Sequence, residues 1–200
     1  MSTLKETLKK KIDEHRPRTV RLLKEHGDVK ISDVTIAQAI GGARGVKCLV
    51  TDVSYLDPFE GIRFRGRTIP ETFAALPAVE GQDYPAVEGF FYYLMTGDIP
   101  TAQQAEEVIA DFKTRRQLPD YVKDILRAMP LDTHPMTMYS AGILAMQREA
   151  TFVKRYNEGM SKMDYWDPMF EDSCNLMAKL PVLAAFIYRL KYKDDDQIAE

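Results

Sequence analysis

Arg44 is the residue whose neighbours best suit it to bind a phosphate group. It lies in the segment Gly41-Gly42-Ala43-Arg44-Gly45. A guanidinium flanked by glycines can approach a phosphate closely and bind two of its oxygens at once, because its N–H groups form a planar fork. The spacing alone is typical of a simple turn, so the segment by itself favours a turn and leaves phosphate binding as an alternative.

The histidines offer little for acid–base chemistry. They occur at three positions, His15, His26 and His134. His15 and His26 lie on the polar face of an expected helix, where we expect them to be solvated. His134 precedes Pro135 at an expected helix start, where it is expected to cap or pack against the helix. None of the three is expected to be catalytic, and the sequence contains no P-loop, GxSxG, HExxH or dinucleotide-binding motif.

The composition excludes several classes of protein. The chain has 200 residues, of which 45% are hydrophobic, and a net charge of −3, which argues against a general nucleic-acid surface. No apolar run approaches the roughly 18 residues that a membrane span requires.

Cys48 and Cys174 are far apart and match no metal-binding spacing, so we expect reduced thiols. The N-terminus has no apolar leader and carries acidic residues that a transit peptide lacks, so we expect a cytoplasmic protein.

Hydrophobic periodicity and turn signals predict an all-α fold with one small β hairpin near 50–66. Asp57-Pro58 and Gly61 mark the turn of this hairpin. No repeat or linker divides the chain, so we expect residues 1–200 to form a single region. The expected helices span about 3–26, 35–40, 70–76, 86–96, 101–117, 119–129, 135–150, 151–158 and 165–192.

Local signals place several side chains on these elements. Thr3 with Glu6, and Thr101 with Gln104, have the spacing of a capping box. Pro17 is expected to kink or interrupt the first helix. The last helix is expected to bury a stripe at three-to-four-residue spacing, made by Met169, Ser173, Met177, Leu180, Ala184 and Tyr188. The second strand is expected to present a solvated or ion-paired edge made by Arg63, Arg65 and Arg67.

Five segments in order along the chain carry a family resemblance. Residues 55–71 read Tyr-Leu-Asp-Pro-Phe-Glu-Gly-Ile-Arg-Phe-Arg-Gly-Arg-Thr-Ile-Pro-Glu and follow the glycine segment around Arg44. Thr96–Thr101, Leu131–Met136, Tyr165-Trp166 and Ala178–Arg189 continue the match. Together they resemble citrate synthase of the type found in mitochondria and some bacteria, from about residue 4 to the C-terminus.

The resemblance implies an activity and two binding residues. Citrate synthases condense acetyl-CoA with oxaloacetate and water, giving citrate and CoA, and the coenzyme enters as a substrate, so no separate cofactor is expected. Arg44 matches an arginine that helps to hold CoA phosphates. Lys162, in Glu158-Gly159-Met160-Ser161-Lys162, stands where well-known members have a second such arginine, and as a lysine it lacks the planar fork.

The resemblance also implies what these 200 residues lack. The reacting aspartate and histidines of the family lie in segments beyond residue 200, so the chain is expected to be the N-terminal part of the large domain and inactive alone. The family is dimeric through helices that match 119–150. The alternatives are a non-catalytic helical module for association or CoA binding, and the N-terminal part of a related 2-methylcitrate synthase. Neither a nucleic-acid partner nor a membrane is expected.

The expected dimer helices carry apolar stripes that periodicity cannot assign to an interface or to an ordinary core. The residues concerned are Val122, Ile125, Leu126 and Met129 on one helix, and Met138, Ala141, Ala145 and Met146 on the next.

Overall fold

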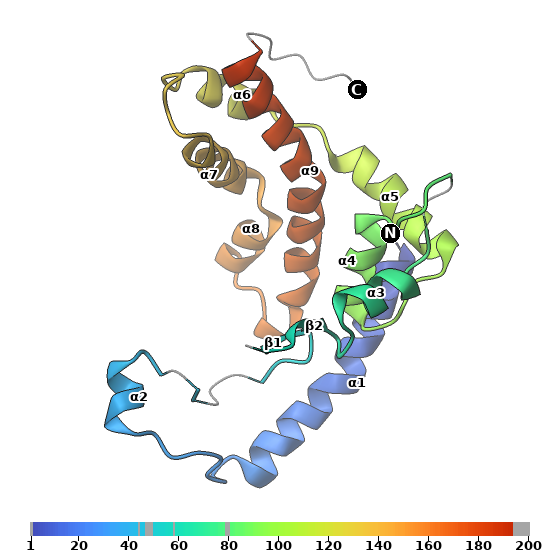
Figure 1. Ribbon diagram of the computed structural model, residues 1–200, viewed down its shortest axis with the longest axis vertical. Helices are drawn as coiled ribbons and strands as arrows, with labels where there is room; N and C mark the ends of the chain where they lie inside the picture. The colour runs from blue at the N-terminus through green and yellow to red at the C-terminus, as the bar shows by residue number, and fades with distance from the viewer. Residues whose placement is uncertain (1, 44, 47–49, 58, 79–80, 194–200) are drawn as a thin grey trace. The chain divides into compact units, whose positions relative to one another are not determined.

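The computed structural model describes residues 2–43, 45–46, 50–57, 59–78 and 81–193. These residues are mainly α-helical and include one two-stranded antiparallel sheet, which confirms the predicted fold class (Figure 1). The chain divides into two compact units, Met1–Val108 and Ile109–Glu200. The boundary falls inside helix α5 (Ala102–Arg115). None of the helices in the described part of the chain is long and apolar enough to cross a membrane.

The first unit contains the hairpin and the helices around it. Its elements are α1 (Ser2–His26), α2 (Ile36–Ile40), β1 (Ser54–Asp57), β2 (Gly61–Phe64), α3 (Ile69–Ala75), α4 (Val87–Thr96) and the start of α5. Helix α1 already begins at Ser2, so Thr3 lies inside the helix, and α1 continues without interruption through Pro17. The predicted capping box at Thr101 is confirmed, because the Gln104 N–H donates to Thr101 Oγ1 at 3.2 Å and the Thr101 N–H donates to Gln104 Oε1 at 2.9 Å.

The hairpin is closed by the turn that the sequence predicts. Ser54 pairs with Phe64 and Asp57 with Gly61 across the two strands. The backbone N–H groups of Phe59 and Glu60 donate to Asp57 Oδ1, at 2.8 and 2.9 Å. Gly61 adopts a φ of 89°, which few other residues tolerate. Asp57 and Gly61 thus have the roles predicted for them, whereas Pro58 lies outside the described residues.

Two tyrosines of α4 form the centre of the first unit. Tyr92 and Tyr93 are 2% and 0% exposed, so both rings belong to the core of this unit. The Tyr92 hydroxyl donates to Thr7 Oγ1 on α1 at 3.3 Å and accepts a hydrogen bond from Gln104 Nε2 at 3.0 Å. The Tyr93 hydroxyl donates to the Phe64 carbonyl at 2.9 Å. These bonds tie α1, α5 and the hairpin to α4, while the rings supply the apolar burial.

The second unit is built on the long helix α9 (Trp166–Tyr192), along which α7 and α8 lie (Figure 1). The other elements are the end of α5, α6 (Asp120–Arg127), α7 (Pro135–Met146), the 3-10 turn η1 (Gln147–Glu149), α8 (Thr151–Asn157) and the 3-10 turn η2 (Lys162–Asp164). The core between α6, α7 and α9 includes Val122, Leu126, Met138, Leu183 and Phe186, each at most 1% exposed.

The predicted inward stripe of α9 is wrong. Met169 and Tyr188, the two ends of that stripe, are both 53% exposed. The residues of α9 that are buried are instead Pro168, Phe170, Cys174, Ala178, Leu183, Phe186 and Ile187. The error arises because apolar residues occur around most of this helix, so a period of three to four residues fits more than one face.

A single carboxylate from α9 caps α8. Asp172 accepts hydrogen bonds from the backbone N–H groups of Thr151 and Phe152, both at 2.8 Å. The first N–H groups of a helix have no partner within it, and a negative charge at this end is also favoured by the helix dipole. This long-range cap fixes the start of α8 against α9.

Candidate functional site

The glycine segment before Arg44 forms the C-terminal cap of α2, which we call a glycine stop. Gly42 has a φ of 76°, and the Ala43 N–H donates to the Gln38 carbonyl at 2.7 Å, the six-to-one bond of a Schellman motif. The N–H of Gly41 donates to the Ala37 carbonyl at 2.9 Å, and that of Gly42 to the Ala39 carbonyl at 3.4 Å. Because these three amides are directed back into the helix, they are not available to an anion.

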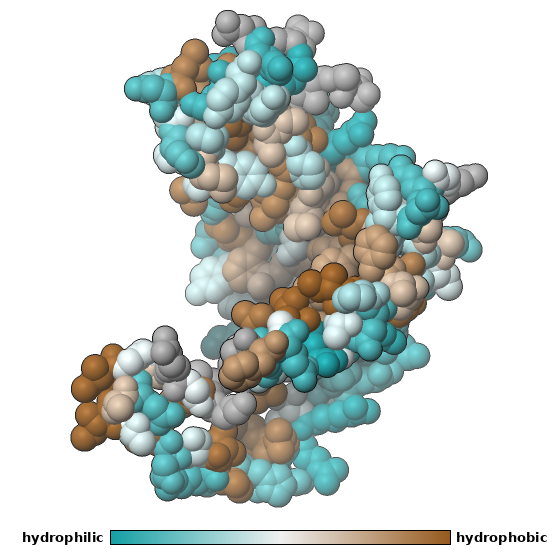
Figure 2. All heavy atoms as spheres, in the orientation of Figure 1, coloured by the Kyte–Doolittle hydropathy of each residue, from teal (hydrophilic) through white to brown (hydrophobic). Residues whose placement is uncertain are grey.

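Arg44 itself lies outside the described residues, so its predicted role is not tested. Helix α2, which precedes Arg44, is capped at its N-terminus, because Thr35 and Gln38 form a capping box. Helix α2 buries none of its residues, and its Ile36 and Ile40 are 81% and 83% exposed. Figure 2 shows the resulting brown apolar surface at the lower left, where Figure 1 places α2.

Lys162 follows a similar glycine stop, at the end of α8. Gly159 has a φ of 87°, and the Met160 N–H donates to the Arg155 carbonyl at 3.1 Å. Ser161 then starts η2, because its Oγ accepts from the Met163 N–H at 3.2 Å. The Lys162 side chain is exposed and forms no hydrogen bond or ion pair with another described residue. It is a cation available to an anionic ligand.

The loop that carries Lys162 is supported on both sides. Arg155 on α8 forms an ion pair with Asp167 on α9. The Phe152 ring meets the Tyr165 ring edge to face, with 5.1 Å between the ring centroids. The Tyr156 ring stacks on the other pair member, Phe152, with 5.9 Å between the ring centroids. Aromatic pairs in this arrangement attract one another beyond their apolar burial. These contacts hold the two ends of the loop together, and so they restrict the position of the loop that carries Lys162.

The histidines lie at the surface of one helix and at the start of another. His15 and His26 are exposed on α1. His134 is the N-cap of α7, where its Nδ1 accepts a hydrogen bond from the Met136 N–H at 3.2 Å. Cys174 is a buried free thiol, whereas Cys48 lies outside the described residues. In the part of the chain that the structure describes, no three His, Cys, Asp or Glu residues are grouped so that they could hold a metal ion.

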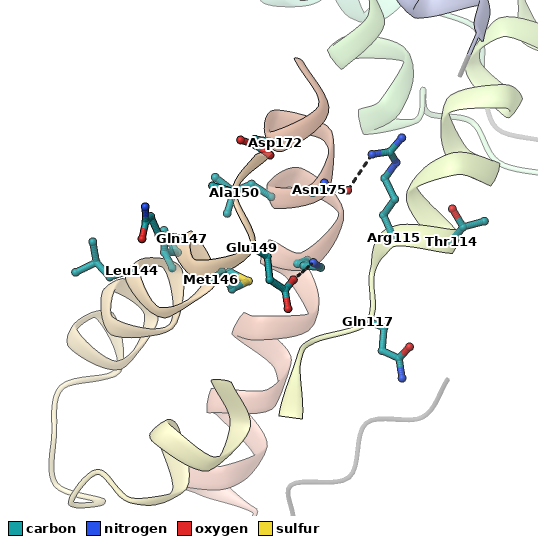
Figure 3. Close-up of a pocket in the computed structure, with 13 residues that line it drawn as sticks. Thr114, Arg115, Gln117, Leu144, Met146, Gln147, Glu149, Ala150, Asp172 and Asn175 are labelled. Carbon is teal, nitrogen blue, oxygen red and sulfur yellow. Dashed lines mark hydrogen bonds and ion pairs between the residues drawn. The ribbon is translucent and has the colours of Figure 1, made fainter. Parts of the chain in front are cut away.

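The second unit also contains a pocket of about 670 Å³. Its walls come from the end of α5, from α7 and η1, and from α9 (Figure 3). Ile143, Leu144, Met146 and Leu176 supply much of its apolar wall. No local sequence pattern predicts this pocket, because its residues come from helices that are far apart along the chain.

The cations of this pocket are already paired. Arg115 Nε lies 2.6 Å from Asp111 Oδ2, and Arg115 Nη1 lies 3.0 Å from Glu171 Oε2. Arg115 Nη1 also donates to Asn175 Oδ1 at 2.8 Å, a contact that is dashed in Figure 3. Burial of Arg115 opposes its charge, but the hydrogen bonds and ion pairs with the two carboxylates outweigh burial and raise its pKa. Lys179 is paired with Glu149 at 3.3 Å. The pocket therefore offers no unpaired cation for a phosphate.

Comparison with known families gives one match that covers most of the chain. A family model described as "Citrate synthase, C-terminal domain" matches residues 42–200. The chain is 47% identical over 192 residues to the mitochondrial citrate synthase of Aspergillus niger, and this covers 96% of the chain and 40% of that relative. The chain thus spans about two fifths of the length of the relatives that it matches.

Two yeast proteins show the same extent of similarity. The mitochondrial citrate synthase of Saccharomyces cerevisiae is 45% identical over 96% of the chain and 40% of its own length. The peroxisomal citrate synthase of the same yeast is 44% identical over 96% of the chain and 43% of its own length. The expectation of a cytoplasmic protein is contradicted, because these relatives are named for organelles. That expectation rested on the first residues of the given sequence, which spans only part of these relatives.

Proposed function

Because the chain belongs to the citrate synthase family, we propose that it is the N-terminal portion of an enzyme that condenses acetyl-CoA with oxaloacetate and water to give citrate and CoA. The observation that carries this proposal is the 47% identity that extends along 96% of the chain. The matched region covers 96% of the chain, so it extends beyond the packed core. In this proposal residues 1–200 form one region of the large domain.

Arg44 and Lys162 bind the phosphate groups of coenzyme A. Two features of the described residues support this assignment. The amides of Gly41 to Ala43 bond back to carbonyls of α2 and are not available to an anion, which favours binding by a side chain of this segment. Lys162 is exposed on a supported loop and pairs with none of the described carboxylates. Hydrogen bonds from a cation to phosphate are among the strongest available to a protein. Coenzyme A is here a substrate, and no further cofactor takes part.

We assign the chemical step to groups outside these 200 residues. A base must remove a proton from the methyl group of acetyl-CoA, and a donor must stabilise the enolate oxygen. Among the histidines, His134 is used as a helix cap and His15 and His26 are solvated on α1. The 200-residue chain therefore binds part of one substrate and does not catalyse the reaction alone.

The complete enzyme is a homodimer that associates through α6 and α7. Met136, Ser140 and Leu144 recur every four residues and form an exposed face of α7, with Met136 and Leu144 60% and 74% exposed. Ile125 on α6 is 43% exposed. The stripe residues Val122, Leu126, Met138 and Met146 are instead buried in the core of this unit. Exposed apolar side chains on one face commonly mark an association surface.

Release of the CoA thiol from acetyl-CoA tests the proposed reaction. We expect the complete polypeptide to release thiol only when oxaloacetate is present, and the 200-residue chain to give no signal above background. Turnover by the 200-residue chain would contradict the assignment of the reacting groups to later segments. A complete polypeptide that prefers a different acyl-CoA, such as propionyl-CoA, would contradict the choice of substrate.

A further inference from the structure

The loop between α8 and α9 is bonded to each of the two helices. The Met160 N–H donates to the Arg155 carbonyl at 3.1 Å, which ties the first part of the loop to the last turn of α8. The Tyr165 N–H donates to the Lys162 carbonyl at 3.4 Å, which ties the second part to the start of α9. Lys162 therefore lies between two turns, and its position depends on what holds the ends of the two helices together.

An ion pair between Arg155 and Asp167 joins these two helix ends. Arg155 Nη1 donates to Asp167 Oδ2, and the two side chains are 37% and 30% exposed. Arg155 lies in the last turn of α8 and Asp167 in the first turn of α9, where the helix dipoles favour a cation and an anion respectively. The two residues are 12 positions apart, so their contact closes the loop that contains Lys162.

Arg155 contacts this loop in two ways. Its carbonyl accepts the hydrogen bond from Met160, and its guanidinium pairs with Asp167 across the base of the loop. The charge of Arg155 is thus matched by a carboxylate, whereas Lys162 forms no hydrogen bond or ion pair with another described residue. Of the two cations, Lys162 is the one available to a phosphate, and Arg155 can affect that phosphate through the loop.

We infer that Arg155 and Asp167 are positioning residues for the phosphate contact of Lys162. This inference rests on the proposed function, in which Lys162 binds a phosphate of coenzyme A. A lysine presents one ammonium on a flexible stem, so it lacks the planar fork that fixes the geometry of an arginine contact. The path of the backbone must then supply more of the preorganisation. Closing the loop in advance lowers the entropy lost when the ligand binds.

The paired substitution of Arg155→Met with Asp167→Asn tests this inference. It removes the ion pair and keeps the net charge of the loop, and methionine keeps the apolar stem of the arginine. In the complete enzyme we expect the KM for acetyl-CoA to rise about two- to fivefold, the range of a partly exposed ion pair. The kcat and the KM for oxaloacetate should not change. Arg155→Lys keeps the ion pair and should leave all three constants unchanged.

A second ion pair of α9 provides the matched control. Lys179 lies 3.3 Å from Glu149 on η1, so this pair also joins α9 to another element of the same unit. Lys179→Met with Glu149→Gln should leave the KM for acetyl-CoA unchanged, even where it lowers the melting temperature. An equal rise in KM in the two paired variants would overturn the inference, because the loss of any ion pair of α9 would then be sufficient.

Combination with Lys162→Ala shows whether the ion pair acts through Lys162. In a chain that already carries Lys162→Ala, the paired substitution should raise the KM no further. A further rise of the same size would overturn the inference, since the pair would then act on the ligand independently of Lys162. An unchanged KM in the paired variant, when Lys162→Ala raises it, would overturn the inference and leave the proposed function intact. If Lys162→Ala has no effect, the proposed contact is wrong and the inference fails with it.

Amide hydrogen exchange in the complete enzyme without substrate measures the loop directly. The Met160 N–H should exchange about two- to fivefold faster in the paired variant of Arg155 and Asp167, because opening of the loop is then opposed by one ion pair fewer. The control variant at Lys179 and Glu149 should exchange at the unmodified rate. Equal Met160 exchange in the unmodified enzyme and the paired variant would overturn the inference without any assay of activity.

Discussion

Gly142 on α7 lies directly against Leu183 on α9. A Cβ added to Gly142 would be 2.8 Å from Leu183 Cδ1 and 3.1 Å from Cδ2. Leu183 is fully buried, so its methyl groups have no free space into which they can move. The absence of a side chain at Gly142 therefore sets how closely the two helices approach.

Gly142→Ala should destabilise the chain. The new methyl group overpacks the α7–α9 contact, which typically costs about 1–3 kcal/mol, whereas replacing glycine in a helix recovers up to about 1 kcal/mol. We expect a net loss of about 1–2 kcal/mol in the free energy of unfolding, measured by urea denaturation.

Gly89 on α4 is the matched control for this prediction. It is also a buried helical glycine, but a Cβ there would meet Ala105 Cβ at 3.7 Å and Pro100 Cγ at 3.8 Å, which are ordinary contacts. Gly89→Ala should therefore leave stability unchanged or raise it by up to about 1 kcal/mol. Equal losses in the two variants would show that close packing at Gly142 is not the cause.

The features predicted correctly from the sequence depend on residues close together along the chain. The hairpin turn at Asp57 and the capping box at Thr101 need only a few neighbours, so their residue types are sufficient evidence. The buried face of α9 could not be predicted, since it depends on which helices pack there. Arg65 was predicted to lie on an edge of β2, whereas its guanidinium donates to the Leu94 carbonyl of α4, which is 29 residues away. The pocket at Arg115 requires several helices to be placed first.

The pH dependence of the hairpin should depend on Asp57. Hydrogen bonds from the N–H groups of Glu60 and Phe59 lower the pKa of Asp57 below its ordinary value of 3.8. A carboxylate with a lowered pKa in the folded state stabilises that state above the unfolded pKa, and this contribution is lost as the pH falls through the folded pKa. Unmodified chain and Asp57→Asn should therefore differ in melting temperature at pH 7 and converge below about pH 3.8.

The comparison isolates the charge, because Asn keeps an oxygen that can accept the same two hydrogen bonds. Glu25, an exposed carboxylate of α1, provides the control substitution Glu25→Gln. A difference between the chain and Asp57→Asn that grows toward low pH would contradict the assigned direction of the pKa shift.

Arg44→Ala in the complete enzyme should raise the KM for acetyl-CoA and leave the KM for oxaloacetate nearly unchanged. A lost charge-assisted contact is worth about 1.5–3 kcal/mol, which corresponds to roughly 10- to 150-fold in affinity. Arg44→Lys should recover only part of this, because the planar fork is lost. Steady-state kinetics with each substrate varied in turn gives both constants.

Lys162→Ala should act in the same direction with a smaller effect, because a single flexible ammonium is removed. Lys154, which is also exposed and lies on α8, serves as the control. A normal acetyl-CoA KM in Arg44→Ala, together with a lower melting temperature, would mean that Arg44 is only a structural residue of its turn.

Charge placed on the exposed face of α7 should weaken self-association. We expect the unmodified chain to form dimers or larger species at tens of micromolar, and Leu144→Glu to shift them toward monomers, because a buried carboxylate without a partner is costly. Light scattering measures both. Leu23→Glu is the control, since Leu23 on α1 is 73% exposed and Leu144 is 74% exposed. A strictly monomeric unmodified chain would rule out this interface.

The cap that Asp172 provides for α8 has a consequence for synthesis on the ribosome. Helix α8 has seven residues and none of them is buried, and helices this short are not stable alone in water. The carboxylate that holds its first amides emerges about 20 residues after them. Since the chain is made from its N-terminus, α8 and the loop of Lys162 must wait for α9 before they acquire a defined shape. The second candidate cation is thus ordered late, by a helix translated after it.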